Sequence, residues 1–198
     1  MIETAGPAAS VALFDGETVV ASQCEEAARG TAERLMAMID ALKPSEIGEI
    51  LVDVGPGSFT GLRVGLAAAV GLGIGWGVPV RGYSATALVA ARSLSEGAAG
   101  ELLAVNEGGH GQYFVQSFAA DPLRAEGVAA SLRPDDIAAD GRTIVGNGAR
   151  SFGGVTVELE ARFALLLPPA LRGLPPVPIY GRAPDAKPVQ SRVEGPKA

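Results

Sequence analysis

The fold of this chain is decided by Asp53-Val54-Gly55-Pro56-Gly57-Ser58-Phe59-Thr60-Gly61-Leu62-Arg63-Val64-Gly65. An apolar run over 49–52 precedes this stretch and predicts a strand, and the apolar segment over 62–72 predicts a helix. The Gly-Pro-Gly turn bends the backbone between the two. A hydroxyl of Ser58 or Thr60 can cap the helix by accepting from a free backbone N–H. The stretch therefore predicts a strand, a tight turn and a helix.

A helix that begins after a glycine turn can bind phosphate, because its first N–H groups and its dipole attract anions. The spacing fits neither the P-loop pattern, which needs a Lys after the glycines, nor G-x-G-x-x-G before a helix. Gly61 and Gly65 lie four residues apart and so share one helical face. This flat face favours close packing against a partner helix over a phosphate site.

The eleven residues from Gly55 to Gly65 resemble the signature of the bacterial TsaB (YeaZ) family. Other stretches agree with it: Ile2-Glu3-Thr4 followed by 9–13 resembles the family's I-D-T…S-V-A-L start, 31–35 its H-A-E-R-L helix, and 180–188 its Y-x-R-A-P-D-A-K segment. The resemblance thus covers nearly the whole chain. Two positions depart from it, since Glu3 stands where the family usually has Asp, and Thr31 where it usually has His.

The resemblance implies a role in the bacterial machinery that makes N6-threonylcarbamoyladenosine (t6A) in transfer RNA. It implies a non-catalytic subunit that pairs with and activates TsaD, the threonylcarbamoyl-transferring paralogue, and recruits the ATPase TsaE. ATP and metal are then expected on the partner subunits, with no cofactor on this chain. We also expect a cytoplasmic protein that forms a homodimer when alone and meets tRNA only through the complex.

The predicted order of elements begins with three strands, two of them joined by the turn Asp15-Gly16. A helix over 31–42, a strand over 50–54, a helix, a strand over 78–81 and a helix over 84–94 follow. This order supports an α/β fold of mixed sheets with helices. The resemblance adds the actin/Hsp70-like, ribonuclease-H-like class with two small lobes. We expect an N-terminal lobe over 1–97, a smaller C-terminal α/β lobe over 98–188 and a tail over 189–198.

Composition narrows the function further. The chain has 198 residues, 47% of them hydrophobic, and a net charge of −6. An acidic chain is a poor stand-alone RNA binder, because cations supply most of the affinity for phosphates. Its one cysteine excludes an internal disulfide. The uncharged stretch 64–80 is short for a membrane span, and its glycines favour a buried helix, a glycine-rich turn and a strand, so we expect no membrane association.

The sequence contains few side chains that could carry out catalysis. His110 is the only histidine and lies in a glycine-rich hairpin tip without a visible partner for a triad. One histidine and one cysteine do not make a typical zinc site. We therefore expect no catalytic residue and no metal ligand.

Glu3 and Thr4 stand where the superfamily ATPases begin their first phosphate loop, so the resemblance makes them weak nucleotide-binding candidates. Pro7 removes one N–H donor from this loop, which favours a plain strand-to-strand turn. A nucleotide-binding ATPase or a glycoprotease-like peptidase of the same superfamily remains the alternative function.

The expected partner interface lies on the helices over 31–42 and 58–72. A small-residue face allows close helix approach, and methionine adapts to irregular partners. On this hypothesis Gly61→Leu or Gly65→Leu abolishes pairing without unfolding the monomer. The candidate interface residues are Thr31, Arg34, Leu35, Met38, Ile39, Ser58, Phe59, Thr60, Gly61, Arg63 and Gly65.

Overall fold

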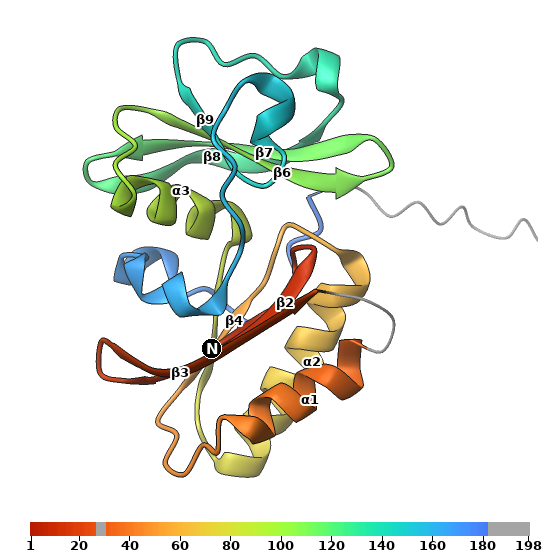
Figure 1. Ribbon diagram of the computed structural model, residues 1–198, viewed down its shortest axis with the longest axis vertical. Helices are drawn as coiled ribbons and strands as arrows, with labels where there is room; N and C mark the ends of the chain where they lie inside the picture. The colour runs from red at the N-terminus through yellow and green to blue at the C-terminus, as the bar shows by residue number, and fades with distance from the viewer. Residues whose placement is uncertain (27–30, 182–198) are drawn as a thin grey trace, which may run out of the picture.

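The computed structural model describes residues 1–26 and 31–181, without the side chain of Thr31. Two sheets lie at opposite ends of the long axis, and helix α3 (Ala85–Ser95) lies between them with part of the C-terminal segment (Figure 1). The mixed α/β class expected from the order of elements is confirmed.

The first sheet has the strand order β3-β2-β1-β4-β5. β1 runs antiparallel to β2 and parallel to β4, and β4 runs parallel to β5. All four residues of β4 are buried, as expected of a central strand that is covered on both faces. The strands are β1 (Ile2–Glu3), β2 (Ala8–Asp15), β3 (Thr18–Glu26), β4 (Ile50–Asp53) and β5 (Val80–Tyr83).

Two helices, α1 (Thr31–Ala41) and α2 (Phe59–Trp76), pack on the same face of this sheet. Apolar side chains from both helices meet side chains from β1, β2 and β4 in one buried cluster. Helical spacing therefore correctly predicts which side of α1 is apolar.

Helix α2 is longer than the sequence predicts, because the expected glycine-rich turn is still helical. Ser58 is its N-cap, and Gly77, in the left-handed conformation, closes its C-terminal end by donating to Gly73 O. A glycine is needed at position 73, because a Cβ there would overlap the side chain of Val80. Within residues 1–26 and 31–181, α2 is the one helix long and apolar enough to span a membrane, but its buried stripe packs into the core.

The second sheet has the order β8-β7-β6-β9, with the β6–β9 pair parallel and the other pairs antiparallel. Helix α3 is almost wholly buried, and one core joins it to residues of both sheets. The strands are β6 (Leu102–Gly109), β7 (Gln112–Ala120), β8 (Leu123–Leu132) and β9 (Thr143–Val145).

A short 3-10 helix, Pro134–Asp136, lies between β8 and β9, and the segment after β9 returns to the first sheet through the 3-10 helices Ala149–Phe152, Ala161–Leu166 and Pro169–Leu171. Ala161 donates its N–H to Ser10 Oγ at 2.9 Å, and Ile179 donates to Val54 O at 2.7 Å. These contacts tie the C-terminal segment to the edge where β4 ends. The predicted tail over 189–198 and the end of the motif over 180–188 lie outside the described residues.

Candidate functional site

Three fully buried polar side chains gather where the strands of the first sheet end. Glu3 ends β1, Asp53 ends β4 and Tyr83 ends β5, and each has an exposed fraction of 0%. These three strands run parallel to one another. The carboxyl ends of parallel strands are where α/β folds usually bind ligands, so this edge is the first place to look for a site.

Glu3 binds groups of its own chain. Its Oε1 accepts the backbone N–H of Ala5 at 2.7 Å and that of Gly6 at 3.2 Å. The Tyr83 hydroxyl lies 3.5 Å from Oε2 and donates to Ile2 O at 3.0 Å. The carboxylate therefore holds the loop after β1 in a tight turn and connects it to β5.

Asp53 lies against Glu3, and burial raises the pKa of both carboxyls. Burial raises the pKa of Asp53 well above its usual range, and the negative charge of Glu3 raises it further. Asp53 Oδ1 accepts the N–H of Gly55 at 2.5 Å, while no described group donates to its Oδ2. One proton between the two groups would relieve their repulsion, because two adjacent buried carboxylates cannot both stay charged.

These contacts occupy hydrogen-bond donors of the loop after β1 that could otherwise bind a phosphate. Ala5 and Gly6 give their N–H groups to Glu3, Ala5 O accepts the N–H of Ser58 at 2.8 Å, and the Thr4 hydroxyl donates to Gly61 O at 2.8 Å. Nucleotide binding at Glu3 and Thr4 stays a prediction, but their observed contacts are structural.

The glycines of the signature stretch let the loop after β1 press onto the start of α2. A Cβ on Gly57 would overlap Ala5, and one on Gly61 or Gly65 would overlap Thr4. Gly61 and Gly65 therefore face the chain's own first loop and are buried. The expectation that they contact a partner helix, and that leucine at either position spares the monomer, is wrong for this steric reason.

A second correction concerns the apolar face of α1. Leu35, Met38 and Ile39 have exposed fractions of 0%, 1% and 8% and belong to the core cluster under the first sheet. They cannot serve as partner contacts while the monomer is folded. Helical spacing alone does not tell a face that is buried in the monomer from one that is buried in a complex.

The remaining candidates lie at or near the surface. Ser58 is exposed and caps α2, its Oγ accepting the N–H of Gly61 at 3.2 Å, and Thr60 is exposed beside it. Arg34 is exposed and donates to Glu26 O at 3.3 Å. For Thr31 the structure describes the helical backbone only.

Phe59 and Arg63 form an ordered cluster with Tyr180 of the C-terminal segment. The Arg63 guanidinium carbon lies 3.7 Å from the centre of the Phe59 ring, and its Nε donates to the Tyr180 hydroxyl at 3.3 Å. The two rings are 5.2 Å apart, and Phe59 is 50% exposed. Arginine and aromatic side chains held in this way are typical of energetically important interface contacts.

The structure adds surface residues that the sequence analysis missed. Val70 and Ile74 of α2 are 39% and 79% exposed, and Met36 of α1 is 45% exposed. Positions 59, 63, 67, 70 and 74 are all exposed and recur at helical spacing, so they form one outward stripe of α2. Reading the apolar residues of α2 as two opposite faces would have revealed this stripe.

The other chemical candidates stay isolated. His110 is exposed at the tip between β6 and β7. Among the described residues, no three histidine, cysteine, aspartate or glutamate side chains cluster as a metal site would require.

Comparison with known proteins identifies relatives. The model of the family "TsaD: tRNA N6-adenosine threonylcarbamoyltransferase" matches residues 18–128. An uncharacterised protein of Mycobacterium leprae is 30% identical over 201 residues, which cover 94% of this chain and 54% of that protein, so the chain spans about half the length of that relative. The tRNA threonylcarbamoyladenosine biosynthesis protein TsaB of Escherichia coli is 31% identical over 144 residues, 68% of this chain and 62% of that protein.

A solved structure shows the same fold. YeaZ from Pseudomonas aeruginosa superposes with a TM-score of 0.77 at 24% identity, over 90% of this chain and 97% of that one. The two-lobed α/β arrangement is therefore shared with this relative.

Proposed function

This chain belongs to the TsaD family, within which it is a member of the TsaB (YeaZ) group, and on that premise we propose that it is a non-catalytic partner subunit in t6A synthesis. Its task in this proposal is to pair with a catalytic TsaD-type subunit and to activate it. The observation that carries the proposal is the exposed stripe of α2, which combines apolar residues with the Arg63 cluster.

The stripe has the composition of a protein interface. Phe59, Val70 and Ile74 expose apolar side chains along one helix, and Met36 adds another from α1. Contiguous apolar surface on a soluble protein marks an interaction site more often than chance exposure does. The Phe59–Arg63–Tyr180 cluster at one end supplies an anchor of fixed geometry.

The closed carboxyl edge of the first sheet supports the absence of catalysis. Glu3 accepts the N–H groups of Ala5 and Gly6, and burial together with the charge of Glu3 raises the pKa of Asp53 well above its usual range. Glu3 Oε1 is thus bound to the backbone of its own chain, which favours a structural role for this carboxyl. The proposal accordingly places ATP and metal on the partner subunits and gives this chain no cofactor of its own.

The proposal also covers the partners of the chain and its location in the cell. With a net charge of −6, the chain meets tRNA only through the complex. We propose that it works in the cytoplasm, that TsaE joins the same complex, and that the chain alone forms a homodimer through the stripe.

A matched pair of variants tests the interface. Ile74→Asp places a charge on the stripe, and Val128→Asp places the same charge on β8, where Val128 is 89% exposed. Because burying an unpaired charge is costly, Ile74→Asp is expected to weaken pairing with the TsaD-type subunit of the same organism at least tenfold, measured by biolayer interferometry. Val128→Asp is expected to pair like the unmodified chain.

Circular dichroism and thermal melting of both variants control for folding. Equal pairing by a folded Ile74→Asp variant and the unmodified chain would place the interface elsewhere.

A further inference from the structure

Arg63 is the single charged residue of helix α2. A helix face that stays in water usually carries several charged side chains. The exposed positions of α2, in contrast, are apolar, glycine or threonine apart from Arg63. A molecule that covers the α2 stripe must therefore accommodate one isolated cation.

Two aromatic rings hold the Arg63 side chain in place. Its guanidinium carbon lies 3.7 Å from the centre of the Phe59 ring and 5.8 Å from the centre of the Tyr180 ring. Its Nε donates to the Tyr180 hydroxyl at 3.3 Å. Stacking on an aromatic face leaves the edge of the planar guanidinium free for hydrogen bonds. Arg63 is therefore ordered in advance and loses little side-chain freedom when it binds a ligand.

The two Nη atoms of Arg63 are left for a further contact. Within residues 1–26 and 31–181, only Tyr180 accepts a hydrogen bond from Arg63, and no acidic side chain pairs with it. A guanidinium keeps its charge in a protein. Arg63 therefore needs an acceptor when the stripe is covered and water leaves, because a buried charge without a partner is costly.

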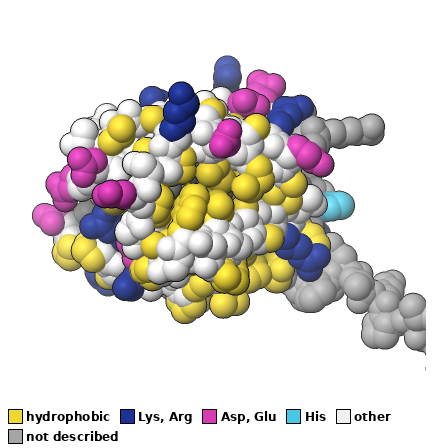
Figure 2. All heavy atoms as spheres, turned by 90° about the horizontal axis from the view of Figure 1, so that it is seen from below, with side chains coloured by type: hydrophobic (Ala, Val, Ile, Leu, Met, Phe, Trp, Pro, Cys, Tyr) yellow, Lys and Arg dark blue, Asp and Glu magenta, His cyan; other side chains and the backbone are white. Residues whose placement is uncertain are grey.

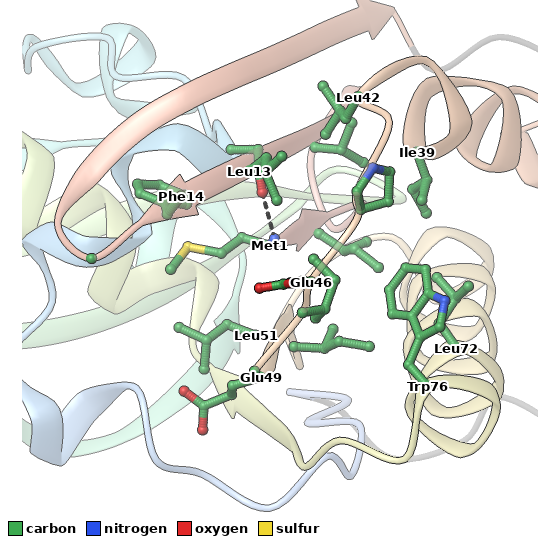
Figure 3. A pocket seen from close by; sticks show the side chains of 18 residues that line it. Met1, Leu13, Phe14, Ile39, Leu42, Glu46, Glu49, Leu51, Leu72 and Trp76 are labelled. Atoms are coloured by element: carbon green, nitrogen blue, oxygen red, sulfur yellow. Dashed lines mark hydrogen bonds between the residues drawn. The ribbon is translucent and has the colours of Figure 1, made fainter.

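Two glutamates at the other end of α2 are too distant to supply this acceptor. Glu46 and Glu49 line a cavity of about 330 Å³ together with Leu72 and Trp76 (Figure 3). At 1.5 Å per residue, Trp76 lies about 20 Å from Arg63 along the helix. Seen from below, acidic and basic side chains surround a hydrophobic centre at that end of the molecule (Figure 2). The stripe has no such mixture of charges, so the acceptor for Arg63 comes from the molecule that covers it.

We propose that this acceptor is the carboxylate of an aspartate or glutamate of the TsaD-type subunit. The inference rests on the proposed function and names the chemistry of its interface. Because Nε is bound to Tyr180, the two Nη atoms form the free edge of the guanidinium, and their parallel N–H groups match the two oxygens of a carboxylate. The Tyr180 hydroxyl accepts from Arg63 and keeps its own proton to donate to the same carboxylate.

This contact also makes the stripe selective. A protein with an apolar face alone could cover Phe59, Val70 and Ile74. It would leave the charge of Arg63 buried without a partner, which disfavours that complex. A phosphate of RNA fits the place less well than a carboxylate, because the chain has a net charge of −6 and the rest of the stripe is apolar.

A chemical cross-link identifies the ligand of Arg63. Arg63→Lys keeps the positive charge and introduces a primary amine, which a water-soluble carbodiimide joins to a carboxylate in direct contact with it. With the TsaD-type subunit of the same organism, this variant is expected to form an amide bond from position 63 to one aspartate or glutamate of the subunit, which mass spectrometry of the digested complex locates. Arg133→Lys, the same change at an exposed arginine of the second lobe, is expected to give no cross-link to the subunit.

Binding measurements test whether the contact determines affinity. Arg63→Met keeps an unbranched apolar side chain and removes the charge, so the carboxylate of the subunit is left unpaired. Biolayer interferometry is expected to show pairing weakened at least tenfold, while Arg133→Met pairs like the unmodified chain. Arg63→Asp, combined with arginine at the cross-linked position of the subunit, is expected to restore part of the affinity. Thermal melting of each variant controls for folding.

The outcomes separate this inference from the proposed function. No complex with the unmodified chain would overturn both. A complex whose affinity a folded Arg63→Met variant leaves unchanged would overturn the role of Arg63 alone. Loss of affinity in Arg63→Met without a cross-link from Arg63→Lys would show that Arg63 meets another kind of acceptor, and would overturn the carboxylate.

Discussion

At the scale of single residues, Glu3 and Asp53 link the fold to pH. Burial raises the pKa of Asp53 well above its ordinary value of about 4, and an unfolded chain has the ordinary value. The folded state therefore holds a proton that the unfolded state releases as the pH rises. The stabilisation from this proton is complete below about pH 4 and is lost as the pH rises through the folded pKa.

Asp53→Asn tests this account. The amide keeps the acceptor for Gly55 and a donor toward Glu3, and it does not titrate. The melting temperature of the variant relative to the unmodified chain is expected to increase steadily from pH 5 to pH 9. Asp40→Asn, an exposed change on α1, serves as the control and is expected to show a flat difference. A flat difference for Asp53→Asn would contradict a raised pKa.

Two glycines of α2 give a second residue-scale prediction. A Cβ at Gly61 would overlap Thr4 O, whereas a Cβ at Gly71 of the same helix meets nothing within 4 Å. Gly61→Ala is expected to destabilise the chain by about 2 kcal/mol through overpacking. Gly71→Ala is expected to stabilise it by about 0.5 kcal/mol through helix propensity. Urea unfolding measures both, and equal midpoints would refute the close approach of the first loop.

At the scale of elements, α2 contributes to both the core and the surface. One stripe of it packs on the sheet and on the first loop, and the opposite stripe from Phe59 to Ile74 is exposed. The helix depends on its N-cap, because Ser58 fixes both the first turn and, through its N–H, the loop at Ala5.

Ser58→Ala should therefore cost about 1 kcal/mol of stability. Ser58→Asp, which can also cap, should restore most of the loss. Differential scanning calorimetry of the unmodified chain and the two variants measures their melting temperatures and unfolding enthalpies. If alanine and aspartate behave alike at this position, the side-chain cap has no energetic role.

The elements show where sequence reasoning succeeds. Strand, turn and helix around Gly55–Gly65 follow from local chemistry, and so does a hydroxyl cap at Ser58 or Thr60, because these signals act over a few residues; the structure selects Ser58. The burial of Leu35 and Met38 in the monomer could not be predicted as such, because periodicity marks an apolar face without saying what covers it. The pairing of Glu3 with Asp53 depends on two strands fifty positions apart and becomes visible only in the sheet.

At the scale of the whole molecule, the first sheet has its carboxyl edge occupied by the chain's own contacts, while the outer stripe of α2 is exposed. The first loop gives its N–H groups to Glu3, so the isolated chain is expected not to bind ATP and Mg²⁺ measurably in isothermal titration. Tight ATP binding that is lost in Glu3→Gln would contradict this expectation and support the ATPase alternative.

In the proposed function, this chain acts by pairing with a TsaD-type subunit through the α2 stripe. The most direct test is size-exclusion chromatography with light scattering of the two purified proteins from one organism, mixed in equal amounts. We expect a stable complex with equal numbers of each chain, which Ile74→Asp disrupts and Val128→Asp leaves intact. Two separate, well-folded species in the unmodified mixture would contradict it.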